Sequence, residues 1–229
     1  ANRGVVEMPI MKEKERESLR KDLSQKLVDD VRVIVFTQDV PCVFCNETVQ
    51  VATELAELSP KIKVEVYDFV RDQMKATELR IDKIPAVAVV GKKDHGIRFY
   101  GIPSGYEFAS LVGAVVDVSR GESGLSKQSK EALKQLDQPV HLQVFVTPTC
   151  PYCPSVVRLA HKMAIESDMI WADMVEANEF VPLAQKYHVT GVPKTVIDGV
   201  FEVAGAVPEE LLVAHVRHAG RDIEPVQPR

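Results

Sequence analysis

All four cysteines of this 229-residue chain fall into two pairs with the same spacing, Cys42-Val43-Phe44-Cys45 and Cys150-Pro151-Tyr152-Cys153. Two cysteines three positions apart can close a disulfide at the start of a helix, because such positions lie on one helix face. The free N–H groups and the positive dipole at a helix N-terminus stabilise a thiolate, which is the form that attacks a disulfide. The spacing therefore predicts thiol–disulfide exchange at both pairs.

Within each pair we expect the first cysteine to be the nucleophile and the second to resolve the mixed disulfide. The predicted nucleophiles are Cys42 and Cys150, and the predicted resolving thiols are Cys45 and Cys153. The residues expected to tune the two sites are Val43, Phe44, Pro151 and Tyr152.

The two sites are not expected to be equivalent. Pro151 suits the first turn of a helix, where its missing N–H would be unpaired anyway, and it should organise the second site better than the β-branched Val43 organises the first. Tyr152 also adds a hydroxyl group that Phe44 lacks. The sequence therefore predicts that Cys150/Cys153 is the principal pair.

The surroundings of the pairs repeat along the chain. The same interval of 108 residues separates Cys42 from Cys150 and Ile84-Pro85 from Val192-Pro193. A β-rich run precedes each pair, and apolar residues at helical spacing follow it. Self-similarity at a fixed interval indicates an internal duplication.

Each half is predicted to have the order α-β-α-β-α-β-β-α, which implies an α/β fold with a central mixed sheet flanked by helices. In the first half the elements are expected near residues 15–28, 31–36, 49–58, 62–67, 73–80, 86–90, 97–100 and 106–118. In the second half they are expected near residues 127–136, 140–146, 156–164, 169–175, 179–188, 195–197, 201–203 and 209–219. The turn-rich segment 121–124 separates the halves, so the predicted domains are residues 1–120 and 121–229.

Composition argues against several other classes of protein. The net charge is −5 and no basic stripe is present, so we expect no nucleic-acid partner. No apolar run approaches the roughly 20 residues of a membrane-spanning helix, so we expect no membrane partner. Residues 1–20 are dense in charged side chains and contain no apolar signal-peptide core. A secreted disulfide scaffold would not confine every cysteine to one spacing.

The segment Pro148-Thr149-Cys150-Pro151-Tyr152-Cys153-Pro154 resembles the active-site segment of glutaredoxins and of the protein disulfide oxidoreductases of thermophilic archaea and bacteria. The latter consist of two tandem thioredoxin-like domains with a Cys-x-x-C pair in each, and the resemblance extends from the first predicted helix to about Ala219. It implies reduction, formation and isomerisation of disulfides in protein substrates, in support of cell redox homeostasis. It further implies redox-active disulfides with no other cofactor and no metal, an upstream dithiol or flavoprotein reductase, and a cytoplasmic location.

The resemblance also implies that Pro85 and Pro193 are cis prolines that face the cysteine pairs. Each proline begins a predicted strand, and the offset from its cysteine pair is the same in both halves. Two trans prolines at the starts of edge strands are the alternative, and the matched offset favours cis. A cis bond would present the backbone of Ile84 and Val192 to an extended substrate chain.

The chain departs from the thioredoxin pattern at the buried acid that lies six residues before the first cysteine. Phe36 and Val144 occupy the corresponding positions here. Asp68 and Glu176 could replace that acid, or could simply end strands at the surface. Neither pair contains the histidine of the strongly oxidising relatives, which suggests intermediate reduction potentials. His161, on the helix after the second pair, is expected at the surface.

Three alternatives remain open at this point. Glutathione-dependent, glutaredoxin-like activity would fit the second pair. A dedicated electron-transfer module for one partner, such as a peroxidase, is a second alternative, although peroxide reductase flavoproteins with a similar tandem fold keep only one cysteine pair. A structural zinc site is a third, remote alternative, because 104 residues separate Cys45 from Cys150 instead of the roughly 15–20 of a zinc ribbon.

Overall fold

The computed structural model describes residues 10–39 and 41–220, and both halves show the predicted order of elements. In the first half the elements are α1 (Glu13–Lys26), β1 (Val31–Thr37), α2 (Cys45–Ala56), β2 (Ile62–Asp68), α3 (Gln73–Glu78), β3 (Ala86–Val90), β4 (Asp94–Tyr100) and α4 (Glu107–Arg120). In the second half they are α5 (Lys127–Leu133), β5 (Val140–Val146), α6 (Cys153–Glu166), β6 (Ile170–Glu176), α7 (Val181–Lys186), β7 (Lys194–Ile197), β8 (Phe201–Ala204) and α8 (Glu209–Ala219). The prediction of tandem thioredoxin-like halves with mixed sheets is confirmed, with most bounds shifted by a few residues.

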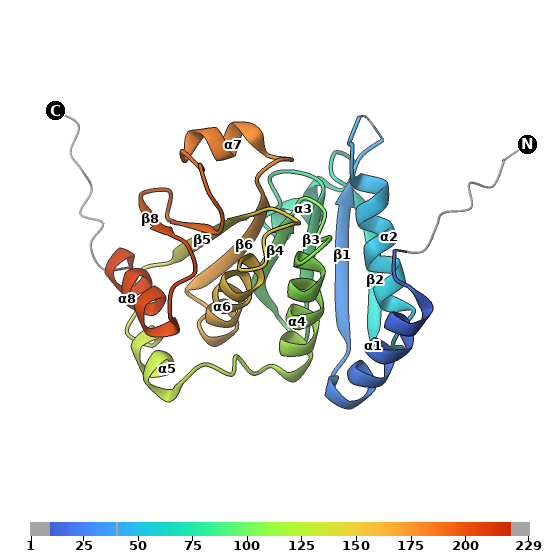
Figure 1. Cartoon of the computed structure of the whole chain (residues 1–229), viewed down its shortest axis with the longest axis horizontal. Coiled ribbons are helices and arrows are strands. Elements are labelled where there is room, and N and C mark those ends of the chain that lie inside the picture. Colours follow the sequence, from blue (N-terminus) through green and yellow to red (C-terminus); the bar gives the residue numbers. More distant parts are fainter. Residues whose placement is uncertain (1–9, 40, 221–229) are drawn as a thin grey trace, which may run out of the picture.

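The strands of the two halves join into one eight-stranded sheet in the order β2-β1-β3-β4-β6-β5-β7-β8 (Figure 1). The join is a parallel pairing of β4 with β6 that runs from Ile97 opposite Ala172 to Tyr100 opposite Val175. The joining of the two halves into one sheet was not predicted. Each half has a complete thioredoxin-like order of elements, and no local sequence pattern indicates which strand pairs with its edge strand.

The four strands β1, β4, β6 and β5 all run in the same direction. β1 and β4 are each antiparallel to β3, and β6 is parallel to both β4 and β5. Their carboxyl ends therefore lie along one edge of the sheet, where open α/β sheets commonly place their functional loops. The loops after β1 and β5 carry the two cysteine pairs to this edge.

Helices cover both faces of the sheet, so the strands are apolar on both sides. The face under α1, α2, α4, α5, α6 and α8 holds the larger hydrophobic cluster, and the face under α3 and α7 holds the smaller one. Residues alternate between them along β1: Val33 and Val35 join the larger cluster, whereas Ile34 and Phe36 join the smaller.

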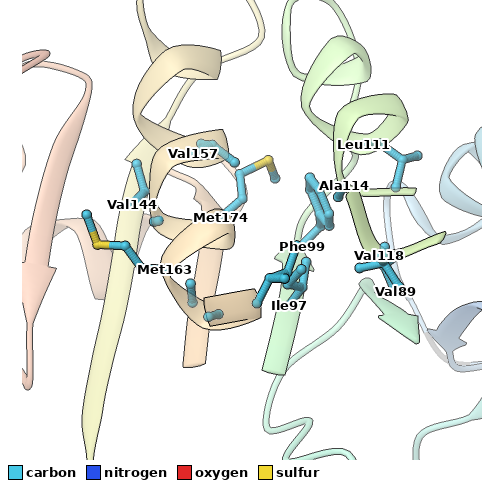
Figure 2. Packing of buried hydrophobic residues seen from close by; sticks show 14 of the residues in the cluster. Val89, Ile97, Phe99, Leu111, Ala114, Val118, Val144, Val157, Met163 and Met174 are labelled. Atoms are coloured by element: carbon cyan, nitrogen blue, oxygen red, sulfur yellow. The ribbon is translucent and has the colours of Figure 1, made fainter. Parts of the chain in front are cut away.

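Helices α4 and α6, one from each half, pack against each other over the joined strands. In Figure 2, Phe99 of β4 lies between the two helices, with Ala114 on one side and Val157 on the other. Full burial of a side chain such as Phe99 contributes roughly 1.5–3 kcal/mol. Arg158 of α6 also donates a 2.9 Å hydrogen bond to Asp117 of α4. These contacts fix one half against the other.

The prediction that His161 lies at the surface is wrong. Its side chain is 2% exposed on the face of α6 that packs against β4, and its ring meets Phe99 edge-on at 4.8 Å. Burial lowers the pKa of His161 to about 3. Contacts with the other half bury this residue, and the helical pattern of one half could not reveal them.

Among the described residues, no helix combines the length and the apolar character that crossing a membrane requires.

Candidate active site

The first pair spans the end of the loop after β1 and the start of α2. Cys42 and Cys45 form a disulfide with their Cα atoms 5.5 Å apart. Cys42 is partly exposed, whereas Cys45 is the first residue of α2 and only 3% exposed. The more exposed cysteine is therefore the predicted nucleophile, and the buried cysteine is the predicted resolving thiol.

The second pair repeats this arrangement between β5 and α6, with a Cα–Cα distance of 5.5 Å across the disulfide. Here both cysteines are buried, with 7% of Cys150 and none of Cys153 exposed. The backbone N–H of Cys153 donates a 3.1 Å hydrogen bond to the sulfur of Cys150. Within the described part of the chain, no corresponding bond forms at Cys42. A donor aimed at the sulfur favours its thiolate, since hydrogen bonding to a charged form lowers the pKa of the group.

The predicted place of Pro151 in the first helical turn is wrong. Helix α6 begins at Cys153, so Pro151 lies in the preceding turn, and Pro154 occupies the first helical turn. The second site still lies at a helix N-terminus. The first N–H of that helix donates a hydrogen bond to the Cys150 sulfur, and Pro151 lies outside the helix.

The peptide bonds Ile84-Pro85 and Val192-Pro193 are both cis, as the resemblance implied. Pro85 and Pro193 are buried, and each precedes the first strand of an antiparallel hairpin. Their carbonyl groups accept hydrogen bonds from Gly101 (2.9 Å) and Gly205 (2.8 Å), which close the hairpins from the opposite strand.

A cavity of about 260 Å³ lies beside the first disulfide. Its lining brings together the nucleophile, both tuning residues and the cis-proline pair, with two residues from the second half; the lining residues are Gln38, Pro41, Cys42, Val43, Phe44, Ile84, Pro85, Asn178 and Glu179. The predicted first-site residues thus line one cavity, except Cys45. Asn178 and Glu179 were missed by sequence analysis, because they follow β6 and reach this site only through the joined sheet.

The tuning residues project toward solvent. The exposed fractions are 79% for Val43, 38% for Phe44 and 69% for Tyr152. Each disulfide is thus flanked by an exposed apolar or aromatic side chain, a kind of surface that protein partners cover.

Neither acid suggested as a replacement for the thioredoxin carboxyl group lines the Cys42 cavity. Asp68 accepts hydrogen bonds from the backbone of Arg71 and Val70, and these bonds lower its pKa, so it ends β2 as a turn residue. Glu176 is buried and accepts hydrogen bonds from the side chain of Asn178 and the backbone of Glu179.

A buried acid that sequence analysis missed is Glu107, the first residue of α4. It is 1% exposed, and burial raises its pKa to about 7 against a weaker opposing contact with the Ser110 hydroxyl. The preceding residue, Tyr106, donates a 3.0 Å hydrogen bond to the carbonyl of Pro148 in the second-site loop. The helical spacing could have revealed its burial, since Glu107 lies four residues before Leu111 on the buried face of α4.

The described residues contain no group of three or more His, Cys, Asp or Glu side chains that could hold a metal ion. Each cysteine pair instead forms its own disulfide.

Comparisons with known proteins agree with this geometry. Residues 140–216 match the thioredoxin domain family. An alkyl hydroperoxide reductase protein of Staphylococcus epidermidis is 32% identical over 156 residues, which are 67% of this chain, and the chain spans only 28% of the length of that relative.

Two solved structures resemble nearly the whole chain. The NTD_N/C domain of alkyl hydroperoxide reductase AhpF from Enterococcus faecalis superposes with a TM-score of 0.83 at 27% identity, over 90% of this chain and 99% of that one. A protein disulfide oxidoreductase from Aeropyrum pernix K1 superposes with a TM-score of 0.84 at 36% identity, over 91% of this chain and 93% of that one. With this identity over almost the full length of both chains, the chain belongs to the protein disulfide oxidoreductase family.

Proposed function

We propose that this chain is a thiol–disulfide oxidoreductase that reduces, forms or isomerises disulfides in protein substrates through Cys42/Cys45 and Cys150/Cys153. One repeated arrangement carries the proposal: a disulfide at the start of a helix, with a cis proline at the matching position of each half. A helix N-terminus activates the attacking thiolate, and a second cysteine three positions on can close the disulfide again.

In the reductive direction, the thiolate of Cys42 or Cys150 attacks a substrate disulfide and forms a mixed disulfide while the other substrate sulfur leaves. The resolving cysteine then attacks the nucleophile's sulfur, closes the enzyme disulfide and releases the second substrate thiol. Two electrons pass from the enzyme dithiol to the substrate. An upstream dithiol or flavoprotein reductase completes the cycle by reducing the enzyme disulfide.

Protein substrates are favoured by the surfaces around the two sites. Val43, Phe44 and Tyr152 offer exposed apolar contacts, and the backbone of the partly exposed Ile84, just before the cis proline, could pair with an extended substrate segment. We also propose a cytoplasmic location, because all four cysteines belong to the two reactive pairs and none is spent on a structural disulfide. That usage suits a compartment that keeps thiols reduced.

Trapping of mixed disulfides tests this proposal directly. A reduced Cys153→Ser variant, mixed with oxidised insulin, should accumulate a covalent adduct through Cys150, because no second thiol resolves it. Non-reducing electrophoresis and mass spectrometry of the adduct identify the linked cysteine. The matched Cys150→Ser/Cys153→Ser variant can form adducts only through the first pair. Absence of any Cys150-linked adduct would contradict the assigned roles.

A dedicated electron-transfer module for a peroxidase is the second candidate, favoured by the likeness to alkyl hydroperoxide reductases. The two functions differ in breadth of substrate. A general oxidoreductase should reduce unrelated protein disulfides, such as those of insulin and scrambled ribonuclease, with kcat/KM values within about one order of magnitude of each other. A dedicated module should react fast with one peroxidase and slowly with both of these proteins.

A further inference from the structure

The cavity beside Cys42 is built by both halves of the chain. The first half contributes seven of the lining residues, including Cys42, Ile84 and Pro85, and the second half contributes Asn178 and Glu179. The halves meet here because β1 and β6 run in the same direction in the joined sheet, so the loops after them share one edge. A substrate sulfur that reacts with Cys42 in this cavity would therefore share the cavity with Glu179.

The Glu179 carboxyl group is fixed against the same backbone that supports the cis proline. Its Oε1 atom accepts a 2.7 Å hydrogen bond from the backbone N–H of Ile102. The neighbouring Gly101 donates its own N–H to the carbonyl of Pro85 at 2.9 Å. Gly101 has a φ of +90°, and a Cβ atom there would lie 2.8 Å from Oε1. The absence of a side chain at Gly101 therefore lets the carboxyl group approach.

Ionisation at the cavity is restricted to two side chains. Among the described residues that line it, Cys42 and Glu179 are the only ones that can ionise. Burial raises the pKa of Glu179 to about 7, with further contributions from Glu176 at the end of β6 and Glu47 on α2, while the Ile102 N–H opposes the rise. Near neutral pH such a carboxyl group exists in both forms, so it can both give and take a proton.

Resting on the thiol–disulfide exchange proposed above, we propose that Glu179 is the proton donor of the first site, although it belongs to the second half of the chain. When the Cys42 thiolate attacks a substrate disulfide, a bond forms between Cys42 and one substrate sulfur and the substrate S–S bond breaks. The departing sulfur keeps the bonding electron pair and takes the proton of the Glu179 carboxyl group, so it leaves as a thiol.

In the reverse direction the same atoms move back. A substrate thiol gives its proton to the Glu179 carboxylate, attacks the substrate sulfur of the mixed disulfide and releases the Cys42 thiolate. Glu179 thus ends protonated, as it began the forward step, and no external oxidant or reductant enters this exchange.

This role predicts a dependence on the leaving group. An aliphatic thiolate is a poor leaving group, whereas an aromatic thiolate of low pKa departs readily without a proton. Proton donation should therefore accelerate reaction with 2-hydroxyethyl disulfide and have no effect on reaction with 4,4′-dithiodipyridine. A residue that only supports the fold would affect both reactions alike.

The test uses the Cys150→Ser/Cys153→Ser protein, in which only the first pair can react. Single-turnover rates of the reduced protein with the two disulfides are measured from pH 6 to pH 8.5, with and without Glu179→Gln. The glutamine keeps an oxygen that can accept the hydrogen bond from Ile102, so loss of the fold is not the expected effect. Glu78→Gln, an exposed acid of α3 that pairs with Lys75, serves as the matched control.

We expect Glu179→Gln to slow the aliphatic disulfide about tenfold at pH 6. The ratio of parent to variant rates should fall to one by pH 8.5 as Glu179 loses its proton. The aromatic disulfide should react at an unchanged rate, and Glu78→Gln should change neither rate. Glu179→Asp, which keeps an ionisable group, should retain a ratio that varies with pH.

Two outcomes would overturn the proposal while leaving the proposed function intact: equal slowing of both disulfides, or a parent-to-variant ratio that does not change with pH. Failure of the parent Cys150→Ser/Cys153→Ser protein to react with either disulfide would instead overturn the proposed function of the first pair, and the role of Glu179 with it.

Discussion

Glu179 and Ile102 lie in different halves of the chain, yet a 2.7 Å hydrogen bond joins the carboxylate of one to the backbone N–H of the other. The loop that contains Ile102 also reaches the second site, where Tyr106 donates its N–H to the carbonyl of Pro148 at 3.0 Å. The segment between β4 and α4 therefore contacts the surroundings of both disulfides. The surroundings of each disulfide are thus contacted by a residue of the opposite half.

Gly101 should be essential to this contact. A Gly101→Ala substitution combines a strained φ of +90° with a Cβ atom placed 2.7 Å from Cβ of Glu176 and 2.8 Å from Oε1 of Glu179. We expect it to lower the free energy of unfolding by roughly 2–3 kcal/mol and to slow the first pair. Gly121→Ala is the matched control, because Gly121 has a φ of +66° with nothing within 4 Å of the added atom. Equal losses of stability in guanidinium unfolding would show that the close approach at Gly101 is unimportant.

Glu107 should make the protein less stable as pH rises. Burial raises its pKa from 4.5 to about 7, so between these values the unfolded chain releases a proton that the folded chain retains. The corresponding loss in the free energy of unfolding is about 3 kcal/mol. It is complete above pH 7 and absent below pH 4.5. A Glu107→Gln variant should lack this part of the pH dependence in chemical unfolding, whereas Glu131→Gln, at an exposed position, should retain it. Parallel stability curves for the Glu107→Gln variant and the parent would contradict the burial of an ionisable group there.

His161 should make the protein less stable as pH falls. Burial lowers its pKa from 6.5 to about 3, so below pH 6.5 the unfolded chain binds a proton that the folded chain does not bind. Stability should fall by roughly 3 kcal/mol between pH 6.5 and pH 4 through this residue alone. His161→Leu should flatten the curve of stability against pH in this range, whereas the control variant His215→Leu should keep the loss that His161 causes. An unaltered acid limb in His161→Leu would mean that the imidazole is not held neutral in the core.

The second pair is expected to carry most of the activity. The N–H of Cys153 lies 3.1 Å from the Cys150 sulfur, and one such hydrogen bond is worth about 1 kcal/mol, or roughly 20 mV for a two-electron couple. In insulin reduction, Cys150→Ser should therefore lose more activity than Cys42→Ser. Equal losses would remove the asymmetry, and a larger loss in Cys42→Ser would reverse the ranking.

The sequence could predict what each half encodes by itself. The β-branched runs before the cysteines became β1 and β5, and the proline that begins each hairpin is cis. Contacts between the halves could not be predicted, because pairing of β4 with β6 depends on surfaces far apart in the chain. The burial of His161 and the place of Glu179 at the first site both follow from that pairing. Pro151 was misplaced for a local reason, since α6 begins at Cys153, two residues after this proline.

Disulfide exchange through Cys42 and Cys150 is tested most directly by measuring the reduction of insulin driven by dithiothreitol. The parent protein should accelerate this reaction, each single Cys→Ser variant should retain part of the acceleration, and Cys42→Ser/Cys150→Ser should fall to the rate of dithiothreitol alone. Circular dichroism of the double variant confirms that the fold persists. Full acceleration by a folded double variant would contradict these roles, because neither predicted nucleophile would remain and only the resolving thiols Cys45 and Cys153 would be left.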